Sequence, residues 1–102
     1  MRRVMVRYRV KPDHVAENEA LVRDVYEELA RVRPDGFHYG TFKLEDGVSF
    51  VHIATQAGEQ SPLGEVAAFQ RFQERIRERC DEPPVVTELA EVGSFRFDGP
   101  AT

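Results

Sequence analysis

The stretch from residue 37 to residue 56, FHYGTFKLEDGVSFVHIATQ, constrains the fold more than any other part of the chain. Two extended runs rich in aromatic and β-branched residues flank the pair Asp46-Gly47. Such a pair between two extended runs predicts a β-hairpin with a two-residue turn. With Asp46 and Gly47 at the turn, the expected cross-strand pairs are Lys43 with Phe50, Thr41 with His52, and Tyr39 with Ala54. The stretch is therefore expected to form the central ribbon of a sheet.

Because side chains alternate along a strand, this register gives the ribbon two distinct faces. One face is apolar and carries Phe42, Leu44, Val51 and Ile53. The other is aromatic with polar groups and carries Phe37, Tyr39, Thr41, Phe50, His52 and Ala54. Neither composition is typical of a sheet face that meets water. We expect helices to cover one face and a second copy of the chain to cover the other.

The flanking segments predict two more strands and two helices. Residues 2–10 alternate with a period of two, which is typical of a strand. An apolar stripe at helical spacing runs from the Pro12-Asp13 start signal to Val32 and ends before Pro34. A second stripe predicts a helix from about Gly64 to Cys80, with arginines near its end that favour the helix dipole. Residues 85–97 are expected to form a long last strand with a bulge at Gly93, and residues 98–102 a flexible tail.

Strand, helix, two strands, helix, strand is the βαββαβ order of a ferredoxin-like sandwich, an α+β fold. Right-handed crossovers predict one four-stranded antiparallel sheet in the order 4-1-3-2, with both helices on one face. At 102 residues the chain is expected to form a single domain, residues 1–102. Together with the second copy, this predicts a homodimer with the architecture of a dimeric α+β barrel.

The composition excludes several classes of protein. A net charge of −4 removes the general attraction on which nucleic-acid binders rely. No apolar run is long enough to span a bilayer, so we expect no membrane partner. The single cysteine, Cys80, cannot form an internal disulfide and suits a reducing cytoplasm. No spaced set of metal ligands is present, so we expect no metal site.

His52 is the strongest candidate for chemistry, because a histidine near hydroxyl groups can be held in one tautomer while it presents a nitrogen to a ligand. His38 falls on the opposite face of the ribbon, so the two histidines cannot form a single site within one chain. The alternative for His52 is a hydrogen-bonded core or interface residue. The aromatic residues expected near it, which form either a small pocket or simply core, are Tyr8, Tyr26, Tyr39, Phe69 and Phe72.

The chain resembles the antibiotic biosynthesis monooxygenase superfamily, whose members are dimeric α+β barrels. The resemblance rests on VRYRVKP at 6–12, RPDG at 33–36, VHIATQ at 51–56 and AFQRF at 68–72, and it spans residues 2–97. Members with known activity include cofactor-independent monooxygenases of aromatic polyketides and haem-degrading enzymes. His52 and Gln56 stand where that family has an asparagine and a tryptophan, and this chain has no tryptophan.

The resemblance implies a homodimer that binds a small aromatic or apolar metabolite and acts as a monooxygenase without a cofactor. His52 would be the catalytic acid, base or hydrogen-bond donor. The residues expected to bind the substrate are Tyr8, Tyr39, Thr41, Gln56, Phe69 and Phe72. The alternative is a dimeric accessory or binding module without enzymatic activity.

Overall fold

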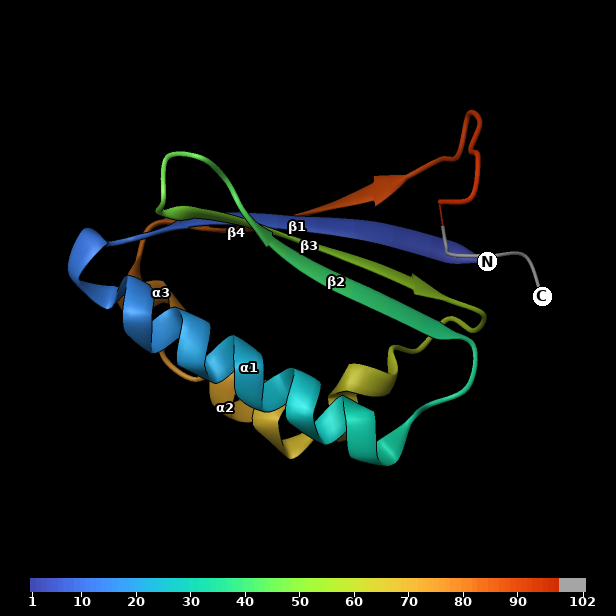
Figure 1. Ribbon diagram of the computed structural model, residues 1–102, viewed down its shortest axis with the longest axis horizontal. Helices are drawn as coiled ribbons and strands as arrows, with labels where there is room; N and C mark the ends of the chain where they lie inside the picture. The colour runs from blue at the N-terminus through green and yellow to red at the C-terminus, as the bar shows by residue number, and fades with distance from the viewer. Residues whose placement is uncertain (98–102) are drawn as a thin grey trace.

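The computed structural model describes residues 1–97 as one four-stranded antiparallel sheet with its helices on a single face (Figure 1). The strands are β1 (Arg2–Val10), β2 (Phe37–Lys43), β3 (Ser49–Gln56) and β4 (Cys80–Leu89). The helices are η1 (Pro12–His14), α1 (Val15–Val32), η2 (Pro62–Glu65), α2 (Ala67–Gln73) and α3 (Ile76–Arg79). The predicted flexible tail lies outside the described residues. The ferredoxin-like α+β fold is confirmed.

The sheet has the order β2-β3-β1-β4, which is the predicted order 4-1-3-2 read from its other edge. The hairpin pairs Lys43 with Phe50, Thr41 with His52 and Tyr39 with Ala54, as the turn signal predicts. β1 lies between β3 and β4 and pairs with both. His52 therefore lies on a central strand, opposite Val6 of β1.

The hairpin turn is longer than the two residues predicted. The backbone N–H of Leu44 donates to the carbonyl of Ser49, and the N–H of Gly47 donates to the carbonyl of Leu44, so residues 45–48 form the loop. Gly47 has a φ of 78°, in the left-handed region that glycine enters without cost. The carboxylate of Asp46 accepts from the backbone N–H groups of Val48 and Ser49, at 3.0 and 2.8 Å. The register survives because both loop lengths place the same residues opposite each other.

α1 packs on the sheet through the predicted stripe, with Asn18 and Val25 buried. Its last turn departs from that stripe, since Val32 is 56% exposed. The helix ends at Arg33, which adopts the left-handed conformation and donates its N–H to the carbonyl of Leu29. Glu28 on α1 accepts from the N–H groups of Ala67 and Ala68, at 3.2 and 2.9 Å, and so caps the start of α2.

The predicted single helix from Gly64 to Cys80 is wrong beyond Gln73. α2 ends there, Arg75 has a φ of 58°, and the chain makes one more turn as α3 before Cys80 begins β4. This break turns Arg79 inward, where it is 3% exposed, instead of leaving it at the solvent-exposed end of a helix. Arg79, one of the arginines expected near the C-terminal end of this helix, is the last residue of α3, and its side chain is buried.

The last strand begins earlier and ends earlier than predicted. β4 spans Cys80–Leu89, so the two prolines after Glu82 lie inside an edge strand, where a missing N–H donor is tolerated. The residues from 90 to 97 form no strand, and Gly93 is therefore not a bulge.

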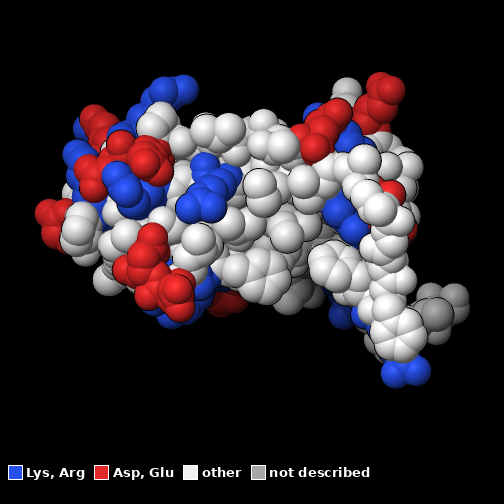
Figure 2. All heavy atoms as spheres, turned by 90° about the horizontal axis from the view of Figure 1, so that it is seen from above, with Lys and Arg blue, Asp and Glu red and all other residues white. Residues whose placement is uncertain are grey.

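The face of the sheet opposite the helices carries the apolar side of the ribbon. Figure 2 shows this face as a mostly white surface with a few blue patches, and most of its acidic atoms lie toward the two ends. Phe42 on β2 is 58% exposed there, and Val85 on β4 is 62% exposed. Val51 and Ile53 on β3 lie between them and are partly buried. The division into two faces is as predicted, and the aromatic face is the one beneath the helices.

Candidate functional site

A cavity of about 520 Å³ lies between the aromatic face of the sheet and the helical segments from 62 to 76. Its walls are mainly apolar side chains, with polar groups from the sheet and from the segment that covers it. The apolar lining includes Val4, Val6, Ala54, Leu63, Phe69, Phe72, Ile76 and Val86. The polar lining comprises Arg2, Tyr8, Tyr39, His52, Gln56, Gln60, Ser61 and Gln73. Ligand sites in proteins commonly combine such an apolar wall with a few polar groups.

His52 contacts a hydroxyl group with each of its ring nitrogens. Nε2 lies 2.8 Å from the Tyr8 hydroxyl, and Nδ1 lies 2.6 Å from the Tyr39 hydroxyl. The hydroxyl of Thr41 lies 3.1 Å from Nδ1. β1 supplies Tyr8, while β2 supplies Tyr39 and Thr41, so the two strands that flank β3 hold the imidazole from opposite sides.

Aromatic rings surround His52, which is 5% exposed. Its ring centroid lies 5.3 Å from that of Tyr8, 5.4 Å from that of Phe72 and 5.7 Å from that of Tyr39. This burial lowers the pKa of His52 to about 4, because the charged imidazolium loses its hydration. The imidazole is neutral at pH 7, so one of its nitrogens carries a hydrogen and the other is an acceptor.

Burial also raises the pKa of both tyrosines that contact the imidazole. The pKa of Tyr39 rises mainly through burial and further through the neighbouring Tyr26 and Tyr8, against a lowering by a hydrogen bond from Thr41. Burial raises the pKa of Tyr8 against the hydrogen bond that Asn18 donates to it at 2.9 Å. Both hydroxyls therefore stay protonated at neutral pH, so the groups that contact His52 are uncharged donors and acceptors.

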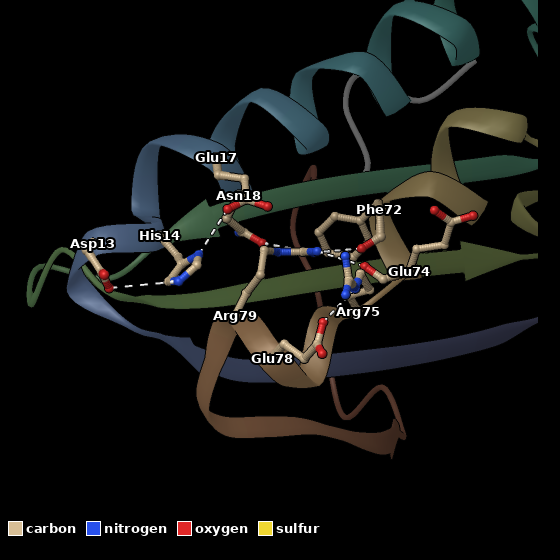
Figure 3. A network of polar contacts seen from close by, with 9 residues as sticks. All are labelled: Asp13, His14, Glu17, Asn18, Phe72, Glu74, Arg75, Glu78 and Arg79. Carbon is tan, nitrogen blue, oxygen red and sulfur yellow. Dashed lines mark hydrogen bonds and ion pairs between the residues drawn. The ribbon is translucent and has the colours of Figure 1, made fainter.

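Two buried residues extend this network toward the end of α2. Asn18 on α1 is fully buried and donates through Nδ2 to the Tyr8 hydroxyl. Arg79 donates to the carbonyls of Phe72, at 2.6 Å, and Glu74, at 3.0 Å, and its Nη2 lies 3.5 Å from Oδ1 of Asn18. Figure 3 shows the Arg79 side chain reaching between Asn18 and the carbonyl groups of Phe72 and Glu74 at the end of α2.

The structure places five of the six residues predicted to bind substrate, together with His52, around the cavity: Tyr8, Tyr39, Gln56, Phe69 and Phe72. Thr41 does not line the cavity, but it contacts the imidazole. The amide of Gln56 donates to the carbonyl of Gly58 at 2.9 Å. Tyr26, which the sequence groups with the aromatic pocket, instead lines a more open hollow beside the start of β2 that it shares with Tyr39.

Sequence reasoning missed the roles of Asn18 and Arg79. Asn18 is a polar residue inside the apolar stripe of α1, and that position is a usable signal for a buried hydrogen bond. Arg79 gave no such signal, because its inward direction depends on the break between α2 and α3. Among residues 1–97, no group of three or more His, Cys, Asp and Glu side chains could hold a metal ion. No helix in that part of the chain is long and apolar enough to cross a membrane.

The fold and the cavity together define a ferredoxin-like α+β domain with a mainly apolar, histidine-containing pocket between sheet and helices. No protein-family model matches the sequence, and no curated protein matches it significantly. Solved structures with the same fold include several that are described as members of the antibiotic biosynthesis monooxygenases.

One structure described as an antibiotic biosynthesis monooxygenase is 19% identical, covers 91% of this chain and 100% of its own, and has a TM-score of 0.69. A mutant of SnoaB, a cofactor-independent oxygenase from Streptomyces nogalater, is 18% identical over 91% of this chain and 94% of its own, with a TM-score of 0.66. NE2512, a protein of unknown function from Nitrosomonas europaea, is 13% identical over 99% of this chain and 95% of its own, with a TM-score of 0.72.

The predicted resemblance to the antibiotic biosynthesis monooxygenases is thus confirmed at the level of the fold. At these identities, the likeness carries the architecture alone, since one fold hosts many functions.

Proposed function

We propose that this protein binds a small aromatic metabolite with a hydroxyl group in the cavity and acts on it as a cofactor-independent monooxygenase. The observation that supports this most is the position of His52, a neutral imidazole held between two tyrosine hydroxyls at the wall of an apolar cavity. A volume of about 520 Å³ falls within the roughly 300–1,000 Å³ typical of small-molecule sites.

The arrangement suits removal of a proton from a phenolic hydroxyl. An electron-rich phenolate can react with O₂ directly: one oxygen atom enters the ring, the other leaves as water, and the substrate supplies all four electrons. The imidazole would hold the substrate proton, relayed through a tyrosine hydroxyl, and the resulting imidazolium would pair with the phenolate. This pairing offsets the burial that disfavours a charged His52 in the empty cavity.

The pocket differs from the one that the resemblance implies, because Gln56 replaces the tryptophan of that family. The amide of Gln56 is held by the Gly58 carbonyl, and Phe69 and Phe72 supply the aromatic wall. We therefore infer a substrate that stacks on phenylalanine rings, whose centroids lie 5.9 Å apart.

We further propose that the active form is a homodimer in a reducing compartment such as the cytoplasm. The exposed apolar side chains on the open face of the sheet, Phe42 and Val85 among them, support association through this face. The thiol of Cys80 is free and buried, which is typical of proteins from reducing compartments.

A binding test and a turnover test separate the two parts of the proposal. Equilibrium dialysis should show that 1-naphthol binds about tenfold more tightly than 1-methylnaphthalene, since a hydrogen bond of about 1.4 kcal/mol gives that ratio. His52→Phe should remove this preference, and His38→Phe, on the opposite face, should retain it. Equal binding of the two compounds to the unchanged protein would refute the proposed site.

The turnover test uses an oxygen electrode with 1-naphthol, a metal chelator and no added cofactor. The reaction converts 1-naphthol and one O₂ into 1,4-naphthoquinone and one water, so oxygen uptake should equal quinone formation. His52→Phe should abolish both.

The second candidate function is a binding module without catalysis. Both nitrogens of His52 already contact protein hydroxyls, an arrangement that also suits a structural role. Selective binding of 1-naphthol without oxygen uptake would support this function over the oxygenase.

A further inference from the structure

Hydrogen bonds connect the buried Arg79 to His52 through Asn18 and Tyr8. The donor and acceptor roles along this network follow from Arg79. Arg79 can only donate hydrogen bonds, so the Asn18 atom that faces it at 3.5 Å must be the carbonyl oxygen. The opposite orientation of the amide would place two donors face to face. The Asn18 NH₂ group is thereby turned to the Tyr8 hydroxyl, which accepts from it at 2.9 Å.

We propose that Arg79, acting through Asn18, makes Tyr8 donate to Nε2 of His52 and so selects the tautomer with its hydrogen on Nδ1. Arg79 and Asn18 are then positioning residues, and Tyr8 and Tyr39 meet the ligand. This inference rests on the proposed function for its ligand, but the tautomer itself is a property of the unliganded protein.

A count of hydrogens supports this tautomer. If Nε2 carried the hydrogen, the Tyr8 hydroxyl would accept from both Asn18 and His52. Its own hydrogen would then point into the apolar cavity with no protein partner, which is costly. With the hydrogen on Nδ1, Tyr8 accepts from Asn18 and donates to Nε2, so both of its contacts are used.

In that tautomer, one hydroxyl hydrogen still has no acceptor within the protein, and it lies on the Nδ1 side of the imidazole. Nδ1 donates into a cluster of three hydroxyls, those of Tyr39, Thr41 and Tyr26, in which Thr41 and Tyr26 lie 2.7 Å apart. The three hydroxyl hydrogens then serve two contacts within the cluster, that of Tyr26 with Thr41 and that of Thr41 with Tyr39, so one hydrogen is left over. In the empty protein, this hydrogen can reach solvent through the open hollow that Tyr26 and Tyr39 line.

Of these three hydroxyls, only that of Tyr39 belongs to a residue that lines the cavity. A ligand oxygen that accepts hydrogen bonds would therefore receive the spare hydrogen from Tyr39. A ligand hydroxyl would meet Tyr8, which passes its own hydrogen to Nε2 as it takes the one from the ligand. The site thus selects an aromatic molecule with a hydroxyl toward Tyr8 and a carbonyl or phenolate oxygen toward Tyr39.

The test is to assign the His52 tautomer by ¹⁵N NMR of the ring nitrogens in the unliganded full chain, at about pH 8. The account predicts at least about a tenfold excess of the Nδ1–H form, from the cost of the unsatisfied hydroxyl. Asn18→Asp replaces the donor with an acceptor of the same shape, so Tyr8 should donate to Asp and the Nε2–H form should dominate. The signals of His14 and His38 serve as internal references and should not change.

Two further variants keep the test decisive if the buried carboxylate prevents folding. Tyr39→Phe removes the nearest partner of Nδ1. It should leave the Nδ1–H form dominant, because Asn18 still donates to Tyr8 and Tyr8 still donates to Nε2. Arg79→Met should lower the excess of the Nδ1–H form at least severalfold.

A dominant Nε2–H form in the unchanged protein, or a switch to it in Tyr39→Phe, would overturn the inference. An unchanged tautomer ratio in Arg79→Met would overturn the part assigned to Arg79. None of these results depends on ligand binding or turnover, so they are separable from the proposed function.

Discussion

Replacing Tyr8 by phenylalanine should destabilise the protein far more than the loss of one oxygen atom suggests. The Tyr8 hydroxyl is the acceptor for Asn18, at 2.9 Å, and lies 2.8 Å from Nε2 of His52. Tyr8 is 2% exposed and Asn18 is fully buried. The variant keeps the ring, which stacks on Phe50 with centroids 5.6 Å apart, so the packing contribution is nearly unchanged.

The expected loss of unfolding free energy follows from Asn18 and His52, which the variant leaves without their hydroxyl partner. A buried polar group without a partner costs about 1–3 kcal/mol, so two such groups predict a loss of about 3 kcal/mol. Tyr26→Phe is the matched control, because its half-buried hydroxyl has one polar partner, Thr41, and should cost about 1 kcal/mol. Urea titration at fixed protein concentration measures both, with unchanged slopes. If Tyr8→Phe cost no more than Tyr26→Phe, the network would not be a buried, interdependent unit.

Three other predictions address the imidazole, the hairpin and the open face. The pKa of His52 is about 4 in the folded protein and about 6.5 when unfolded, so the unfolded chain binds more protons between these values. The stability from this shift is complete above about pH 6.5 and falls as the pH drops. In urea titrations, the wild type should therefore lose about 2 kcal/mol more unfolding free energy than His52→Gln between about pH 8 and pH 5. Equal losses would contradict the shift. Gly47→Ala should cost about 1 kcal/mol of unfolding free energy, because its φ is 78°, whereas Gly58→Ala should cost nothing, and equal costs would refute the turn geometry. In light scattering, Phe42→Asp should convert a dimer of twice 11.7 kDa into a monomer. Val32→Asp, at a similarly exposed position on α1, should leave the dimer intact. A dimer in both variants would exclude the open face as the interface.

The hairpin register was predictable because two independent signals agree on it. The Asp-Gly pair fixes where the chain reverses, and the alternation of side chains fixes which residues share a face. The longer loop did not disturb the register. The loop is closed by the carboxylate of Asp46, and it leaves the same residues paired across the two strands. The position of His52 among hydroxyl groups followed directly from this register.

The second half of the site could not be predicted in the same way. Two adjacent prolines usually mark a turn or the end of a helix, but Pro83 and Pro84 lie within β4, where the unpaired edge of the strand tolerates them. The helix itself breaks at Arg75, which no residue preference requires. Arg79 faces inward because its guanidinium donates to the backbone carbonyls of Phe72 and Glu74 at the end of α2. These contacts depend on the break in the helix, so they leave no periodic pattern in the sequence.

The most direct test of the central claim is a two-dimensional ¹H–¹⁵N NMR titration of the protein with 1-naphthol. The account predicts saturable shifts in residues that line the cavity, above all the ring of His52 and the amides of Ala54 and Phe72. The amides of Phe42 and Val85, on the open face of the sheet, should stay in place. Shifts confined to the open face, or no saturable shifts at all, would contradict a ligand site beside His52.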